Sequence, residues 1–568
     1  MPPLPMTRIS MSHRDWRSSW LTPSLLGLLA LIIRFHYAGA GRIVWGDEPF
    51  YLWLGRNWFG GQGYHMGFYD YWDYHHTPGY PFITALLTRL SGDMTRASEW
   101  SYILFGAMLT LVIYFLARRI YGGRSALAAG LLVALAPATA IMPLYWGTMT
   151  EPPYWALSLA GAFFAYRAFQ RFRALDVALA GLFLALAYYV RPEAVVYLGA
   201  MGLVLGLRAL SRPPRIKNLG YPLLLGVVFL AVIFPYLYRV HEETGVWTIS
   251  QKVGANFATA EGLAVGDFRR FDIETWGLDS TGEHVRFFSE ETADASALAF
   301  ILGDPVGYAR ILYGNTLKLL SQLFDAHLFP WYLLIPLALA LFGRAWDRER
   351  AWNELFLAAL LLPGLSFILF FVQERYVASL VLPMFIWAGH GLVALGEWLR
   401  QTVWNVWKGV SSEQYLSAQG RGWGLVWLPT ALLMAFFLVM GPRQADSAYL
   451  AGSVRPVHLE AARELAPYVH PGDVLMSRYV AIAWHSGAEW LPTPAAGVDE
   501  TLAYARYHGA RFWAIDGYEA HHLRPQFAPL VDDPDNPPPG LKLLLVVADE
   551  RGGEPVVIYE ILPAASGG

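Results

Sequence analysis

Residues 21–58 read LTPSLLGLLALIIRFHYAGAGRIVWGDEPFYLWLGRNW and join an apolar run to a pair of adjacent carboxylates. The run over 21–40 is long enough to cross the roughly 30 Å hydrocarbon layer of a bilayer. The basic segment MTRISMSHRDWRSSW precedes this run, and no clear small-residue cleavage site follows it. We therefore interpret it as an uncleaved first membrane span rather than a removed signal. Asp47 and Glu48 lie just past this span, and Pro49 and several aromatic residues follow them.

The composition is typical of a membrane protein. Of the 568 residues, 55% are hydrophobic and 15% are charged, well below the roughly 25% charged residues of ordinary globular chains. The 23 Trp residues suit bilayer interfaces. The net charge of -3 gives no sign of a nucleic-acid surface, so no nucleic-acid partner is expected. The absence of cysteine excludes disulfides, thiolate metal sites and cysteine nucleophiles.

Apolar runs recur along the chain and predict about eleven membrane spans. Their ranges are 21–40, 98–117, 125–142, 153–169, 174–190, 194–208, 219–238, 329–343, 354–371, 377–396 and 423–440. Arginine and lysine collect in every second connecting loop, which places those loops and the N-terminus in the cytoplasm. With eleven spans the C-terminus lies outside. We therefore predict a mainly α, multi-pass protein of the inner or plasma membrane, with the lipid bilayer as its surroundings.

Three longer segments fall on the predicted outer side of the membrane. The loops 41–97 and 239–328 belong with the spans to a predicted membrane module over residues 1–441. The third segment, 442–568, alternates helical patterns such as PVHLEAARELAPYV with strand patterns such as DVLMS, RFWAID and PVVIYEIL. This alternation predicts a small extracytoplasmic α/β domain at the C-terminus.

Nearly every unusual polar residue near a span end falls on this outer side. The set is Asp47, Glu48, Glu151, Arg191, Glu193, Lys252, Asn256, Glu374, Arg375 and Tyr376. Asp47 and Glu48 are sequence neighbours whose side chains diverge, so they do not suit the opposed carboxylates of glycosidases. One carboxylate acting as a base suffices when the leaving group is a phosphate whose charge is absorbed by arginines. The pattern therefore favours transfer of a group from a lipid phosphate at the membrane surface.

Several of these residues also have a purely structural interpretation. An acidic residue before proline begins many helices, so Asp47 and Glu151 can serve as helix starts. Arg191 and Arg375 can hold lipid head groups. The Tyr and Trp residues of 64–80 are more typical of an interfacial belt than of a sugar-binding platform.

The helix predicted after Pro49 has one apolar face. The residues on that face are Phe50, Trp53, Leu54 and Trp58. Such a face is what a helix lying in the bilayer interface requires. Helix capping can explain one of the two carboxylates before it, but hardly both.

Five motifs, in their order and sidedness, resemble the GT-C glycosyltransferases. They are the acidic pair after the first span, TEPPYW at 150–155, VRPEAVV at 190–196, TGVWTISQK at 244–252 and QERYVASLVLP at 373–383. The nearest resemblance is to bacterial members of the protein O-mannosyltransferase group and to the lipid A aminoarabinose transferases. It covers roughly residues 20–440, with a tail like that of many bacterial members.

The resemblance implies an inverting transfer of a sugar, hexosyl or pentosyl, from a polyprenyl-phosphate donor. The acceptor is a hydroxyl on a protein, lipid or glycan at the outer face of the cell envelope. The residues that match the family's acidic positions are Asp47 as the catalytic base, Glu48 and Glu151. The expected donor-phosphate contacts are Arg191, Lys252, Arg375 and Tyr376. Weaker expected contacts to the acceptor or sugar are Tyr74, His75, His76 and Asn256.

One element departs from the family pattern. Relatives often have Lys-Pro-Pro or His-Pro-Pro after the first loop, whereas this chain has HHTPGYP at 75–81. The roles of His75 and His76, as metal ligands or acceptor contacts, are therefore open. A divalent metal occurs in some GT-C branches and not in others, so the resemblance implies no particular cofactor.

Two other classes of function compete with the enzyme hypothesis. A transporter or flippase of lipid-linked sugars usually has charges or Gly/Pro breaks in the middle of its spans and paired repeats. These spans are nearly free of charge at their centres, and the sequence shows no internal repeat. A non-catalytic envelope protein would leave the one-sided set of acidic residues and arginines without a purpose. The glycosyltransferase is therefore the main hypothesis.

Overall fold

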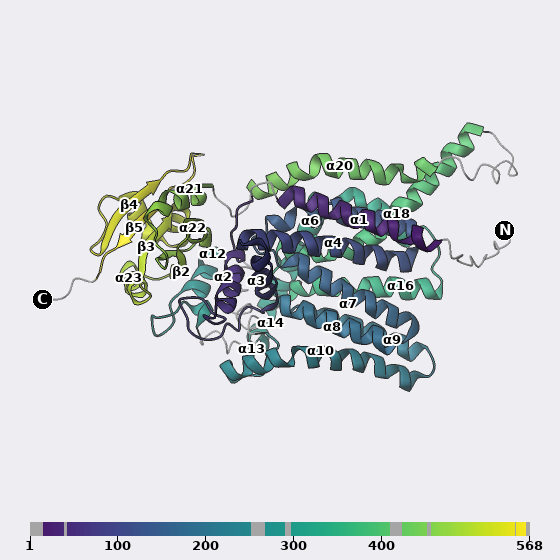
Figure 1. The fold of residues 1–568 in the computed structure, drawn as a ribbon, viewed down its shortest axis with the longest axis horizontal. Coiled ribbons are helices and arrows are strands. Elements are labelled where there is room, and N and C mark those ends of the chain that lie inside the picture. The colour runs from purple at the N-terminus through teal and green to yellow at the C-terminus, as the bar shows by residue number, and fades with distance from the viewer. Residues whose placement is uncertain are drawn as a thin grey trace.

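The structure is a computed structural model that describes residues 15–38, 42–250, 267–289, 297–408, 423–450, 456–550 and 552–563. A bundle of long helices lies at one end of the molecule and a small sheet with its helices at the other (Figure 1). The helices α2 (Glu48–Phe59), α3 (Gly79–Ser91) and α12 (Phe268–Trp276) lie between the two.

The bundle is built from long helices and several shorter ones. The long helices are α1 (Asp15–Ala38), α4 (Met94–Tyr121), α7 (Glu151–Arg171), α8 (Ala174–Val190), α9 (Ala194–Ser211), α10 (Arg215–Thr244), α14 (Pro305–Leu323), α18 (Glu374–Lys408) and α20 (Trp423–Leu450). The shorter helices are α5 (Gly123–Leu135), α6 (Pro137–Ala140), α13 (Ala297–Gly303), α15 (Leu334–Phe342), α16 (Arg348–Ala359) and α17 (Leu362–Leu365). Single 3-10 turns are η1 (Met142–Leu144), η2 (Arg286–Phe288), η4 (Trp331–Leu333) and η5 (Ser366–Leu369).

All of the predicted spans fall on helices, although several are broken. Among the described residues, seven helical segments are long and apolar enough to cross a membrane: Trp20–Ala38, Met94–Tyr121, Ala194–Ser211, Arg215–Thr244, Arg348–Leu369, Glu374–Val403 and Gly424–Arg443. The other predicted spans lie on α7 and on three shorter apolar helices, Gly123–Leu135, Ala174–Val190 and Trp331–Phe342. The prediction of a mainly helical, multi-pass membrane protein is confirmed. The count of eleven spans stays a prediction.

The span predicted over 125–142 is interrupted because Pro137 cannot continue α5. Proline has no N–H for the carbonyl of Val133, and it holds Ala136 in an extended conformation. The buried guanidinium of Arg34 in α1 donates to the carbonyls of Val133 at 3.0 Å and Thr139 at 3.3 Å. A charged side chain inside the first span thus completes the hydrogen bonds that the proline leaves open.

Helix α18 packs against α5, α14, α15 and α20, and its most apolar stretch of 18 residues is 89% buried. Two glycines let neighbouring backbones approach it closely, as small residues do between membrane helices. A Cβ on Gly391 would lie 1.6 Å from the carbonyl oxygen of Pro336, and one on Gly389 would lie 2.5 Å from the amide nitrogen of Ala129. The first turn of this fixed helix carries Arg375 and Tyr376.

The basic residues that defined the predicted cytoplasmic loops gather at the end of the bundle far from the sheet. Arg124 pairs with Glu397 at 3.0 Å, and Arg208 and Arg212 pair with Glu349 at 2.6 and 3.2 Å. The other end of the bundle faces α2, α3 and the sheet (Figure 1). The Arg- and Lys-rich loops, predicted from the sequence to share one side, thus lie together at one end of the bundle.

The C-terminal unit, residues 456–550 and 552–563, contains a five-stranded sheet in the order β2-β1-β3-β5-β4. The strands are β1 (Val474–Ser477), β2 (Glu489–Pro492), β3 (Ala510–Asp516), β4 (Leu541–Val547) and β5 (Val556–Ile561). β1 is parallel to β2 and β3, whereas β5 is antiparallel to β3 and β4. The helical elements are α21 (Pro456–Leu465), α22 (Val480–Ser486), α23 (Val498–Tyr507), α24 (Ala528–Asp532), the π-helical η7 (Glu519–Leu523) and the 3-10 turns η6 (Ala466–Tyr468) and η8 (Pro525–Phe527).

The apolar face of α2 packs on this C-terminal unit. Phe50 lies edge-on to Trp490 with ring centroids 5.6 Å apart, and Trp53 contacts Trp484 at 5.2 Å. Phe50, Trp53 and Leu54 are all buried. The expectation that this face lies in the bilayer interface is therefore wrong, because protein aromatic rings cover it instead of lipid.

Candidate active site

Asp47 and Arg375, 328 residues apart in the sequence, form an ion pair. Nη1 of Arg375 donates to Oδ2 of Asp47 at 3.2 Å. Asp47 occupies the N-cap position of α2, but its side chain makes no capping hydrogen bond. The Asp47 side chain is 53% exposed, whereas that of Arg375 is only 16% exposed. Asp47 is therefore accessible to a second molecule while a nearly buried cation holds it.

Arg191 lies in the turn between α8 and α9 and is held by two carboxylates. Its Nη1 donates to Glu151 at 2.7 Å, and its Nη2 donates to Glu193 at 3.0 Å. Burial lowers the pKa of Arg191, but the charges of Glu193 and Glu151 prevail and raise it well above its usual value. The guanidinium of Arg191 is therefore permanently charged.

The ring of Tyr376 lies close to both guanidiniums. The Cζ atoms of Arg191 and Arg375 each lie 5.0 Å from its centroid, within the range of cation–π contacts. The Arg375 side chain also donates from Nη2 to the Tyr376 hydroxyl at 3.0 Å. Its Nε is buried and has no hydrogen-bond partner among the described residues. An unmet donor on a buried guanidinium is a position at which an anion would be stabilised.

Glu48 turns away from Asp47 into the protein. Arg42 binds both of its carboxylate oxygens, at 2.6 and 2.8 Å, and the Ser98 hydroxyl donates to Oε1. The side chain of Glu48 is 1% exposed and that of Arg42 is 3% exposed. The buried, bidentate ion pair with Arg42 and the hydrogen bond from Ser98 attach Glu48, at the start of α2, to α4.

Tyr51 was not among the residues chosen from the sequence. It lies one helical turn after Asp47, and its ring packs edge-on against His76 and Tyr80 at 5.3 and 5.6 Å. Burial, followed by the charge of Asp47, raises the pKa of its hydroxyl, so the group stays a hydrogen-bond donor. Helical spacing from Asp47 is the signal that could have identified it.

The histidine pair that departs from the family pattern divides between two environments. His76 contacts Tyr51 and is oriented by Asp73, whose carboxylate lies 3.1 Å from Nδ1 of His76. Burial raises the pKa of Asp73, but the neighbouring His76 outweighs it and brings the value to about 2. His75 and Tyr74 stack on each other and on the rings of Phe287 and Tyr71, in the aromatic layer below the C-terminal unit. Only His76 therefore lies against the helix of Asp47.

The start of α18 is held by a second group of side chains. Glu374 accepts a hydrogen bond from Nε1 of Trp146 at 2.9 Å and lies 3.0 Å from Nε2 of His327. Burial lowers the pKa of His327, but the hydrogen bond and charge of Glu374 outweigh it and raise the value. These residues fix the turn that carries Arg375.

Two of the predicted contacts, Lys252 and Asn256, lie outside the described residues. For a metal, no group of three His, Asp or Glu side chains gathers in the described part of the chain. The three candidate carboxylates, Asp47, Glu48 and Glu151, instead each face a guanidinium.

Comparison with known proteins gives one family match over part of the chain and several structures of similar fold. The family described as dolichyl-phosphate-mannose-protein mannosyltransferase matches residues 75–238. The archaeal oligosaccharyltransferase AglB from Archaeoglobus fulgidus, in complex with an inhibitory peptide and a dolichol-phosphate, superposes with a TM-score of 0.57 at 12% identity. The match covers 91% of this chain and 72% of AglB.

A second similar structure is ArnT from Cupriavidus metallidurans bound to undecaprenyl phosphate. Its TM-score is 0.53 at 14% identity, and the match covers 95% of this chain and 98% of ArnT. The fold is that of the GT-C glycosyltransferases. The resemblance expected from the motifs is thus confirmed at the level of fold. No curated protein matches the chain in sequence.

Proposed function

We propose that the protein is an inverting membrane glycosyltransferase that moves a sugar from a polyprenyl phosphate to a hydroxyl acceptor at the outer face of the membrane. The observation that carries this proposal is the Asp47–Arg375 ion pair beside the Arg191–Tyr376 contact. The exposed carboxylate of Asp47 lies near the guanidiniums of Arg375 and Arg191. These residues lie at the end of the bundle opposite its arginine-rich turns.

The reaction is a single displacement. Asp47 takes the proton of the acceptor hydroxyl as its oxygen bonds to the anomeric carbon of the donor sugar. The bond between that carbon and the phosphate oxygen breaks, and its electron pair leaves with the polyprenyl phosphate. Attack from the face opposite the leaving group inverts the configuration.

Arg375 is the main cation for the departing phosphate. Its Nε has no partner among the described residues, and a phosphate oxygen bound there would complete a bidentate contact. Arg191 is already neutralised by Glu151 and Glu193, so it contributes by exchanging one carboxylate for the phosphate. Binding of the anionic donor at Arg375 would also loosen the hold on Asp47 and leave that carboxylate available as a base.

The test is the variant Asp47→Asn, which keeps the shape of the side chain and removes its basicity. General bases contribute about 10²–10⁴-fold in rate, so turnover of a polyprenyl-phosphate sugar should fall by about 100-fold or more. Equilibrium binding of undecaprenyl phosphate to purified protein should remain, because Arg375 is intact. Wild-type turnover in this variant would disprove the role of Asp47.

The complementary variant is Arg375→Ala, with Arg239→Ala as the control. Arg239 is an exposed arginine near the end of α10 that pairs with Glu242 and Glu243 and lies over the ring of Trp72 at 5.9 Å. Arg375→Ala should weaken binding of undecaprenyl phosphate and lower turnover, whereas the control should do neither. An effect of Arg375→Ala on acceptor affinity alone would contradict the phosphate role.

A further inference from the structure

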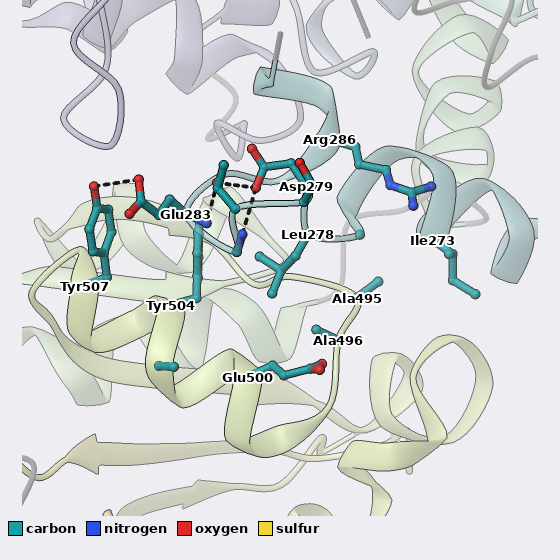
Figure 2. Close-up of a pocket in the computed structure, with 15 residues that line it drawn as sticks. Ile273, Leu278, Asp279, Glu283, Arg286, Ala495, Ala496, Glu500, Tyr504 and Tyr507 are labelled. Atoms are coloured by element: carbon teal, nitrogen blue, oxygen red, sulfur yellow. Dashed lines mark hydrogen bonds between the residues drawn. The ribbon is translucent and has the colours of Figure 1, made fainter. Parts of the chain in front are cut away.

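A cavity of about 670 Å³ lies between the external loop of residues 277–286 and the C-terminal unit. Figure 2 shows the loop with Asp279 and Glu283 above the segment that carries Ala495, Glu500 and Tyr504. Its volume falls within the about 300–1,000 Å³ of small-molecule sites. The cavity is thus built by two parts of the chain that are more than 200 residues apart in sequence.

Three carboxylates line this cavity, and each uses one oxygen to hold the local structure. The contacts are Oδ1 of Asp279 with Thr281 and Gly282 at 2.7 and 3.0 Å, Oε2 of Glu283 with the Tyr507 hydroxyl at 3.0 Å, and Oε2 of Glu500 with the Gly497 amide at 3.0 Å. The second oxygen of each accepts no hydrogen bond from the described residues. The loop and α23 therefore fix three hydrogen-bond acceptors around one space.

Tyr504 provides an unmet donor on the same wall. It is 1% exposed, and its hydroxyl has no hydrogen-bond partner among the described residues. Burial, followed by the charge of Asp279, raises its pKa, so the hydroxyl keeps its proton. Leaving a buried hydroxyl without a partner is unfavourable, and a ligand that accepts its hydrogen bond would remove that cost.

The charge of the lining selects the class of ligand. Three carboxylates face one guanidinium, Arg286, so phosphates and other anions are repelled. Asp279 and Glu283 lie in the loop and Glu500 lies in α23, and the described residues contain no group of three His, Asp or Glu side chains placed to hold a metal ion. Hydroxyl groups, which donate to carboxylates and accept from tyrosine, fit this set, and the ring of Tyr507 supplies an aromatic face.

The cavity is connected to the helix of the proposed base. The carbonyl of Trp276 accepts a hydrogen bond from Ala495 at 2.8 Å. On the other side of the loop, Phe288 stacks on Phe50 with ring centroids 5.4 Å apart and planes within 3°. Phe50 is three residues after Asp47. The loop that lines the cavity therefore packs, through Phe288, on the helix that begins beside Asp47.

We propose that this cavity is a subsite for an oligosaccharide. The acceptor in the proposed reaction is then a glycan, and the cavity binds sugar rings of that glycan other than the one whose hydroxyl reacts. The inference rests on the proposed function for its place in the reaction, but binding can be measured without transfer.

The experiment is saturation-transfer NMR on the full chain in nanodiscs, with maltotriose, cellotriose and α-mannotriose as probes. At least one trisaccharide should bind, and the double variant Glu283→Gln/Tyr504→Phe should weaken that binding at least fivefold. Both substitutions preserve the size of the side chains. The control Tyr468→Phe changes an exposed tyrosine elsewhere in the unit and should leave binding unchanged.

Three outcomes would overturn the inference: no trisaccharide binds, the double variant binds as well as wild type, or trilysine binds in place of the sugars. The variant Asp47→Asn separates the two proposals, because it should abolish transfer and leave trisaccharide binding intact. If binding behaves as expected while Asp47→Asn retains wild-type transfer, the proposed mechanism fails and the sugar site stands.

Discussion

Asp47 and Glu48 are adjacent in sequence and have different surroundings. The carboxylate of Asp47 is half exposed beside Arg375, whereas that of Glu48 is buried in a bidentate pair with Arg42. The divergence expected from their sequence positions is present: in the proposed mechanism the exposed residue is the base, whereas the buried one attaches α2. The two residues therefore make a matched pair for mutation.

Glu48→Gln should destabilise the protein. It leaves the buried guanidinium of Arg42 without its closest counter-charge, and breaking such a pair by removing one partner costs about 3–5 kcal/mol. The thermal midpoint of the purified protein should fall for Glu48→Gln and remain near the wild-type value for Asp47→Asn. Equal midpoints for Glu48→Gln and wild type would show that the Arg42 pair does not hold α2.

At the scale of elements, the position of Arg375 depends on what holds the start of α18. Trp146 and His327 both reach Glu374, the residue before it. His327 comes from the segment between α14 and η4, and no motif in the sequence indicated it. The link between these elements is therefore visible only in the folded chain.

His327→Gln should loosen this turn. It removes the imidazole that contacts Glu374 but keeps a hydrogen-bonding side chain of similar length, so the fold should survive. We expect weaker binding of undecaprenyl phosphate, by several-fold, with an unchanged thermal midpoint. The control is His470→Gln, at an exposed histidine of the C-terminal unit that contacts Asp473 and Arg511. A loss of donor binding in the control as well would contradict a specific effect on α18.

At the scale of the whole molecule, α12 is fastened to the C-terminal unit by a buried ionic network. Asp272 binds Arg478 at 2.9 Å and Arg524 at 2.6 Å, and Arg524 also binds Glu519 at 2.7 Å. Asp516 adds a third buried carboxylate, so carboxylates outnumber guanidiniums. Burial and the neighbouring carboxylates raise the pKa of Glu519 to about 7, against the opposing effect of the two arginines.

This shift predicts that stability depends on pH. The folded protein keeps a proton on Glu519 at pH values where the unfolded chain has lost it, so the unfolding free energy falls as pH rises from about 4.5 to about 7. The slope from this group is at most about 1.4 kcal/mol per pH unit. Glu519→Gln should reduce the fall of the thermal midpoint between pH 5 and 7. The exposed control Glu464→Gln should retain it, and identical profiles for both variants would refute the assignment.

The sequence could predict those features of the fold and the candidate site that depend on short segments of the chain. Span positions and most strands follow from apolar runs and alternation, which are properties of short segments. The strand β2 and the helix α22 were missed because they are short and lie within the segment VAIAWHSGAEWLP, where neither period is established. The convergence of Asp47, Arg191 and Arg375 was expected from sidedness, but the sequence could not give the pairing of each carboxylate with its cation.

The apolar face of α2 was misassigned for a related reason. Amphipathic helices look alike whether lipid or protein covers them, because both bury the same side chains. The deciding contacts, with Trp484 and Trp490, come from more than 400 residues away. Only the tertiary arrangement distinguishes the two cases.

The packing of α2 against the C-terminal unit has a mechanical consequence. The N-terminal end of this three-turn helix places Asp47 beside Arg375, and its apolar face packs on Trp484 and Trp490 of the C-terminal unit. A shift of that unit would therefore change the separation between Asp47 and Arg375. In the proposed reaction, such a shift would slow transfer with no rearrangement of the long helices.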